Sequence, residues 1–212
     1  SGAAQWWLVH LSGVSRFELL TSEHSDASLT TYKHVVRSAT TDYVSSDSQL
    51  SIQARFEVAG SPNPTPLRLR VSPEFKIESV TVAEQPVEWK VQPGPTAELS
   101  LIELVNLAPN TQDLTLKFKA TSPIDLSGKV DLPLLAIAEG YVIDGLCRVW
   151  GENGVVPDQL QAVNATVERR PRASANATPM RGTSAGSSLL WQTHWLGEPP
   201  TMNATFSRLR HL

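Results

Sequence analysis

Apolar and polar side chains alternate along most of this chain with a period of two residues. In the stretch 50–58 the even-numbered residues are all apolar, and the odd-numbered ones are polar. Successive side chains of a β-strand point to opposite faces of its sheet, so this pattern predicts a strand with one buried and one wetted face. Similar stretches recur along the chain, separated by turns rich in Pro, Gly and Asn. The sequence therefore predicts an all-β protein, mainly an antiparallel β-sandwich, built as one large sandwich or two packed ones.

The alternation changes phase once, in the stretch 75–82. Phe75 and Ile77 occupy one parity, whereas Val80 and Val82 occupy the other. A shift of one residue near Ser79 predicts a β-bulge, or a strand that is buried on both faces there.

The predicted strands fall into two regions, residues 1–121 and residues 122–212, unless the two form one continuous domain. Residues 169–188 are rich in Ala, Ser, Arg, Pro and Gly and have no apolar face, which predicts a long mobile loop. We expect residues 189–196 and 202–212 to form a final hairpin. In the strand expected at 97–107 we expect Leu99 and Leu101 to point inward.

Composition and charge limit the classes of partner. The formal net charge is -3, so the chain has no excess of cations to neutralise phosphates, and we expect no nucleic-acid partner. No apolar run approaches the roughly 20 residues that a membrane-spanning helix needs. Only 18% of residues are charged, while Ser, Thr and Pro are abundant. This balance is typical of exported β proteins. The chain opens with Ser1 and Gly2 without Met, and we expect it to be a piece excised from a larger exported protein.

The residues that usually carry chemistry form no known motif. No two of the five histidines lie two or four positions apart, and no nucleophile elbow or phosphate-binding loop occurs. We therefore expect no metal, no cofactor, no catalytic residue and no enzymatic activity. Cys147 lies in an apolar run, which favours a buried core thiol over a nucleophile. Asp144 and Glu152 flank the stretch CRVW, but a chain with 21 acidic residues offers such a pair without any catalytic role.

The sharpest candidate for a ligand site is the stretch WQTHW. In a strand, Trp191, Thr193 and Trp195 share one face, and two indoles about 7 Å apart form a platform on which sugar rings stack. The opposing interpretation is that these indoles fill the core, and the number of tryptophans favours it. Basic residues concentrate at Arg169, Arg170, Arg172 and Arg181, where a solvated linker is favoured over a contact with an anionic surface or polysaccharide. Asn164, Asn176 and Asn203 each begin Asn-Ala-Thr, an acceptor for glycans only in a eukaryotic secretory pathway, and the sequence leaves this open.

A succession of four stretches within residues 66–120 carries a family resemblance: LRLRV, FKIESVTVAEQPVEWKV, AELSLIELVNL and DLTLKFKA. It resembles the non-catalytic β-sandwich domain of M1-type aminopeptidases and similar modules of large exported bacterial proteins. In those aminopeptidases the catalytic residues lie in the following zinc domain, on a helix with the motif HExxH. That motif is absent from this sequence, so the resemblance implies a scaffold or accessory module only.

These observations together predict a non-enzymatic structural or adhesive module that is extracytoplasmic, either periplasmic or on the cell surface. Its expected partners are other domains of the same larger protein, a cell-surface protein or a polysaccharide. The alternative is a carbohydrate-binding module that uses an exposed platform of Trp191 and Trp195.

Overall fold

The computed structural model describes residues 32–46, 48–61, 65–105, 107, 113–125, 129–171 and 189–208. Residues 32–212 make up one compact unit. Every regular element in the described residues is a β-strand, which confirms the predicted all-β class. In chain order these strands are β1 (His34–Ser46), β2 (Gln49–Val58), β3 (Arg68–Val71), β4 (Lys76–Val82), β5 (Gln85–Pro86), β6 (Trp89–Pro93), β7 (Ser100–Leu104), β8 (Leu114–Pro123), β9 (Lys129–Asp131), β10 (Leu135–Ile137), β11 (Gly140–Gly151), β12 (Val155–Ala162), β13 (Thr166–Pro171), β14 (Leu189–Gly197) and β15 (Met202–Arg208).

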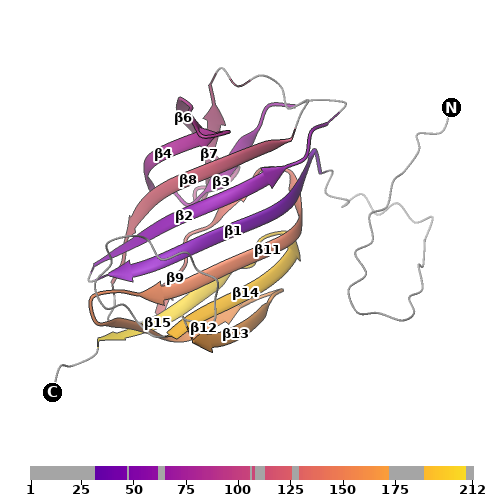
Figure 1. The fold of residues 1–212 in the computed structure, drawn as a ribbon. Coiled ribbons are helices and arrows are strands. Elements are labelled where there is room, and N and C mark those ends of the chain that lie inside the picture. The colour runs from indigo at the N-terminus through magenta and orange to yellow at the C-terminus, as the bar shows by residue number, and fades with distance from the viewer. Residues whose placement is uncertain are drawn as a thin grey trace, which may run out of the picture. The chain divides into compact units, whose positions relative to one another are not determined.

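Eight of these strands form one large sheet, in the order β13-β14-β11-β1-β2-β8-β4-β5. Figure 1 shows β8, β2, β1, β11 and β14 running side by side. β1 and β11 are parallel, whereas the other neighbouring pairs of this sheet are antiparallel. The prediction of a mainly antiparallel structure is therefore confirmed.

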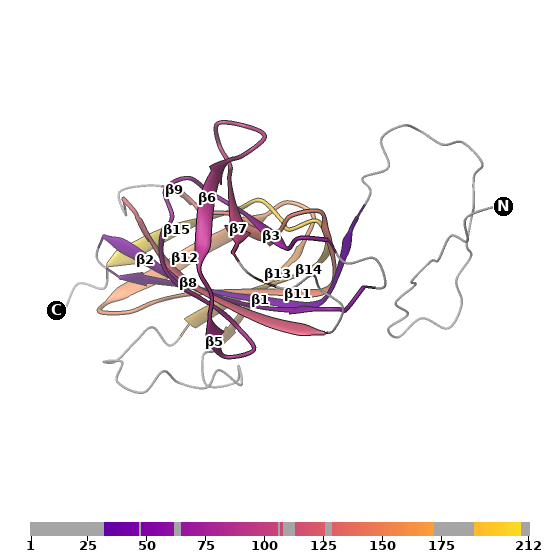
Figure 2. The same ribbon diagram turned by 90° about the horizontal axis from the view of Figure 1, so that it is seen from above.

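Two smaller sheets form a second layer, one in the order β10-β3-β7-β6 and one in the order β12-β15-β9. In Figure 2, β3, β7 and β15 lie on one side of the large sheet. A single apolar cluster joins the layers, with Phe56 and Phe118 from the large sheet, Ile102 from the four-stranded sheet and Phe206 from the three-stranded sheet. The fold is therefore a β-sandwich whose layers share one core.

Burial follows the alternation of the sequence closely. The apolar residues of β2 are buried, and the polar residues between them are half-buried or exposed. The predicted β-bulge near Ser79 is confirmed, because the register between β4 and β8 shifts between Ile77 and Ser79. Val80 and Val82, beyond the shift, are buried in the core.

Two expectations about individual strands are wrong. In β7 the inward residues are Ile102 and Leu104, whereas Leu101 is only half-buried. β14 and β15 do not pair with each other, since β14 lies between β11 and β13 and β15 lies between β12 and β9. The chain changes layers between these strands, at a segment that contains Pro199 and Pro200, and proline cannot donate a ladder hydrogen bond.

The division of the chain near residue 122 stays a prediction. Strands from both sides of this position meet in the large sheet, where β1 pairs with β11. Of the predicted loop at 169–188, residues 169–171 belong to β13, which pairs with β14. Residues 172–188 lie outside the described residues.

Candidate functional site

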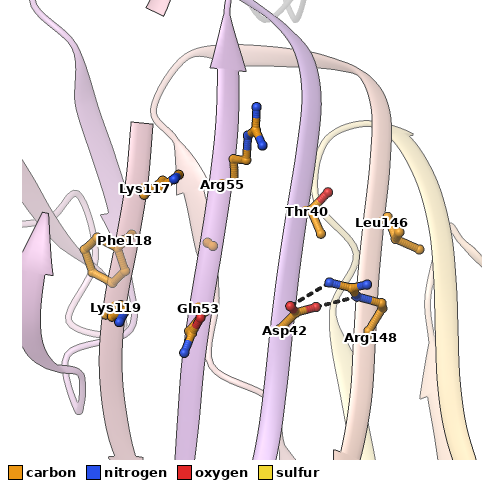
Figure 3. A pocket seen from close by; sticks show the side chains of 10 residues that line it. Thr40, Asp42, Gln53, Arg55, Lys117, Phe118, Lys119, Leu146 and Arg148 are labelled. Atoms are coloured by element: carbon orange, nitrogen blue, oxygen red, sulfur yellow. Dashed lines mark hydrogen bonds and ion pairs between the residues drawn. The ribbon is translucent and has the colours of Figure 1, made fainter. Parts of the chain in front are cut away.

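A hollow of about 520 Å³ lies on the outer face of the large sheet, which is the face turned away from the second layer. Four central strands of the sheet border it, and Figure 3 shows their side chains. Its lining consists of Thr40 and Asp42 from β1, Gln53, Ala54 and Arg55 from β2, Lys117, Phe118 and Lys119 from β8, and Leu146 and Arg148 from β11.

Strand register brings these residues together, although they are far apart in the sequence. One row across the sheet runs Leu146–Thr40–Arg55–Lys117. The next row on the same face runs Arg148–Asp42–Gln53–Lys119. Because alternate residues of a strand share a face, the two rows form one mainly polar surface, with Leu146 as their apolar member.

An ion pair joins the two parallel strands at one side of the hollow. The Arg148 guanidinium donates two hydrogen bonds to the Asp42 carboxylate, from Nε to Oδ1 at 2.6 Å and from Nη2 to Oδ2 at 2.7 Å. Each side chain is only 19% exposed. Such a fork-to-fork pair fixes both groups and neutralises both charges. Figure 3 shows the pair bridging β1 and β11.

Three further cations line the hollow, and their charges are neutralised less fully than that of Arg148. Arg55 pairs with Glu57 at 2.8 Å, and both side chains are exposed to solvent. Lys117 pairs with the exposed Glu84. None of the ion pairs among the described residues involves Lys119. Four cations and one carboxylate give the lining a formal charge of +3, in contrast to -3 for the whole chain.

The side chains of the candidate sugar platform lie largely in the interior. Trp195 is 8% exposed and Thr193 is fully buried. Trp191 is half-buried, and its indole Nε1–H donates a hydrogen bond to the Pro157 carbonyl at 3.0 Å. The guanidinium of Arg169 lies over the Trp191 ring, 5.6 Å from its centre. An exposed pair of indoles is therefore not found at these positions, and the alternative of a carbohydrate-binding platform receives no support.

Cys147 and Tyr43 are ionisable groups within the apolar core. Cys147 is buried, as predicted, and burial raises the pKa of its thiol from 9.0 to about 12. Burial likewise raises the pKa of Tyr43 well above 10.0, and its hydroxyl donates a hydrogen bond to the Pro133 carbonyl at 2.8 Å. A thiol that resists ionisation in this way is a poor nucleophile.

These raised pKa values predict a loss of stability in alkali. The folded state holds both protons more tightly than the unfolded state does, so the free energy of unfolding is unaffected by these groups below about pH 9 and falls as the pH rises towards 12. Urea unfolding at a series of pH values from 8 to about 11 measures the slope. The double variant Cys147→Ala, Tyr43→Phe is expected to show a shallower slope than the wild type. Parallel slopes in the two proteins would contradict the assignment.

The remaining candidates from the sequence do not gather into one site. Asp144 is exposed on β11, and Glu152 is half-buried beyond its end. His34 is buried, with Nε2 3.2 Å from Thr65 Oγ1, whereas His194 is exposed on β14. Within the described residues, no three His, Cys, Asp or Glu side chains form a group that could hold a metal ion.

The basic residues and glycan acceptors are only partly described. Arg170 pairs with Glu168 on β13, at the edge of the large sheet. Asn164 lies in the turn before β13, and Asn203 lies in β15. The other members of both groups, Arg172, Arg181 and Asn176, lie outside the described residues.

The hollow was not predicted from the sequence. The alternation did place Arg55, Lys117 and Lys119 on the wetted faces of their strands. It carried no signal that β2 and β8 are neighbours, or that β1 and β11 lie beside them. A signal would have required the strand order, which local periodicity does not contain.

Comparisons with known proteins find similarity in structure only. No protein-family model and no curated protein sequence matches this chain. Its structure is similar to an M1 zinc metallopeptidase from Deinococcus radiodurans, with a TM-score of 0.46 and 11% identity over 82% of this chain and 42% of that chain. It is also similar to leukotriene A4 hydrolase from yeast, with a TM-score of 0.49 and 9% identity over 88% of this chain and 32% of that one.

This chain therefore corresponds to less than half the length of either structure. The M1 zinc metallopeptidase is of the class of enzyme that residues 66–120 resemble. A search of the described residues for a helix long and apolar enough to cross a membrane finds none.

Proposed function

We propose that this chain is a non-catalytic structural module of a larger exported protein, with the other domains of that protein as its partners. One observation carries the proposal: the polar residues buried in the described interior are only His, Thr, Ser and Gln, within a large apolar core. No Asp, Glu, Lys or Arg is among its buried residues. The void beside Cys147 and Trp195 has a volume of only about 10 Å³, at the lower limit of what one water molecule needs and far below any substrate.

The outer face of the large sheet supports an adhesive role for this module. β1, β2, β8 and β11 each have hydrogen-bonded neighbours on both sides. Their backbones are therefore held in place, and their outward side chains form a rigid surface. A surface of this kind suits contact with a partner, because little conformational entropy is lost when the partner binds.

The proposal places the module outside the cytoplasm, in the periplasm or on the cell surface. Composition supports this placement, with few charged residues and abundant Ser, Thr and Pro. The buried Cys147 is consistent with it, since the thiol is protected from oxidation by its position.

Two measurements test the proposal. The purified chain is incubated with fluorogenic aminoacyl, ester and glycoside substrates, and we expect no rate above that of the same protein unfolded by heat. In intact cells that produce the complete larger protein, an added protease is expected to cleave a tag fused to this module. Turnover that depends on the folded state would contradict the non-catalytic role. A tag that is cleaved only after the cells are lysed would contradict the placement.

A further inference from the structure

We propose that the hollow on the outer face of the large sheet binds an acidic polysaccharide, through the carboxylates of its uronic acid residues. This inference names a ligand for the adhesive role proposed above and rests on that role. Four features of the hollow carry it: its charge, the spacing of its cations, the hydrogen-bonded pairing of its strands on both sides, and the ion pair at its side.

The charge of the hollow selects an anion. Its lining carries a formal +3 within a chain of net -3, so the charge of the lining is opposite in sign to that of the chain. The partners of Arg55 and Lys117 are exposed carboxylates, Glu57 and Glu84. Exposed pairs of this kind contribute little stability, so a ligand carboxylate can replace either partner at small cost.

The spacing of the cations selects a ligand with several charges. Arg55 on β2 lies directly opposite Lys117 on β8. The Cβ atoms of such cross-strand neighbours are about 5 Å apart. Lys119 follows two residues after Lys117 on the same face, about 7 Å along the strand. A single small anion reaches one or two of these groups. A uronan, with one carboxylate on every sugar, offers charges to all three at once.

The backbone of the hollow disfavours a peptide ligand. All four bordering strands are paired on both sides, so no ladder hydrogen bond is open to a peptide, and its amide groups would be left without backbone partners. A sugar chain carries hydroxyls and carboxylates instead. These groups are complementary to the Thr40 hydroxyl and to the cations that line the hollow.

The lining also disfavours single-stranded nucleic acid. Its one aromatic residue, Phe118, is 1% exposed and belongs to the core beneath. Binding of single strands relies on exposed aromatic rings that stack with bases, and the hollow presents none.

The ion pair of Asp42 and Arg148 defines one side of the proposed site. Arg148 neutralises the only carboxylate of the lining, so Asp42 does not repel an acidic chain. The three cations outside this pair, Arg55, Lys117 and Lys119, lie on the other side, on β2 and β8, and we infer that the carboxylates of the ligand bind there.

The test compares two double variants with equal change of charge. Lys117→Gln, Lys119→Gln removes two cations from the hollow. Lys90→Gln, Lys129→Gln removes two exposed lysines from β6 and β9 in the second layer. Binding of polygalacturonate is measured by isothermal titration calorimetry at low salt. We expect the hollow variant to bind at least about tenfold more weakly than the wild type and the control variant to stay within about twofold.

Further probes separate the ligand classes. Fully methyl-esterified polygalacturonate, which keeps the sugar and lacks the charge, is expected not to bind. Polyglutamate and oligothymidylate are expected to bind more weakly than polygalacturonate at equal charge. Equal loss in both double variants, no binding by the wild type, or stronger binding of polyglutamate or oligothymidylate would overturn the proposal.

The outcomes remain separable from those of the proposed function. Absence of binding leaves a non-catalytic module without this ligand. Release of new reducing ends from bound polygalacturonate would contradict the non-catalytic role, while the binding site would stand.

Discussion

Replacement of Phe118 by alanine is expected to lower the free energy of unfolding by about 3–5 kcal/mol. Phe118 is 1% exposed and lies on the inward face of β8, opposite Ala54 of β2 and Val80 of β4. Its ring packs edge-to-face against Phe75, with centres 6.2 Å apart. Alanine removes this contact and leaves a cavity that paired strands on both sides cannot collapse to fill.

Urea unfolding followed by tryptophan fluorescence measures this loss. Val91→Ala is the matched control, because Val91 is 60% exposed on the edge strand β6. We expect that variant to stay within about 0.5 kcal/mol of the wild type. A loss below about 1 kcal/mol for Phe118→Ala would show that the two layers do not share the core described above.

Replacement of Gly145 by alanine is expected to lower the free energy of unfolding by about 3 kcal/mol, at the upper end of the range for overpacked cores. The Trp195 indole lies against Gly145 across the antiparallel pair β11 and β14. A Cβ atom added at Gly145 would stand 2.3 Å from Cε2 and 2.4 Å from Cδ2 of that indole. Neither the buried ring nor the paired backbone can move away without disturbing the core.

A double-mutant cycle tests the assigned cause. In a Trp195→Leu background the side chain opposite Gly145 is smaller and flexible, so Gly145→Ala is expected to cost about 1 kcal/mol or less. Unfolding by urea gives all four free energies. If Gly145→Ala costs the same in both backgrounds, the indole is not the obstacle, and the backbone conformation at the nearby register shift between Val142 and Gly145 becomes the cause.

Local alternation was sufficient to predict the fold class and the inward residues of several strands. In β2 and β8 the residues of one parity are apolar and those of the other are charged or polar. The side chains of Phe56, Leu116 and Phe118 were therefore expected to point toward the core, and all three are buried. The shift of parity after Ile77 located the β-bulge for the same reason.

Where both parities are apolar, the same reasoning failed. β7 carries Leu101, Ile102 and Leu104 within one short run, so the pattern did not decide which of them faces the core. WQTHW shows a related difficulty. Alternation correctly grouped Trp191, Thr193 and Trp195 on one side, but only the position of β14 beside β11 shows that this side is the interior.

The hollow lay beyond sequence reasoning because it depends on strand order. Its rows join residues of β1 and β11 that no hairpin connects, and the members of the ion pair Asp42 and Arg148 are 106 positions apart. Non-local pairing of this kind leaves no periodic trace in either strand.

The parallel pairing of β1 with β11 also governs how the chain reaches its native state. β1 and β2 can pair soon after synthesis, but the other edge of β1 has no partner until β11 has been made about a hundred residues later. Closing so long a loop is entropically costly, so we expect the centre of the large sheet to form late and slowly. During that interval the open edge of β1 is a template for pairing with other chains. β1, which joins the two halves of the finished sheet, is therefore also the strand through which the nascent chain is most prone to aggregate.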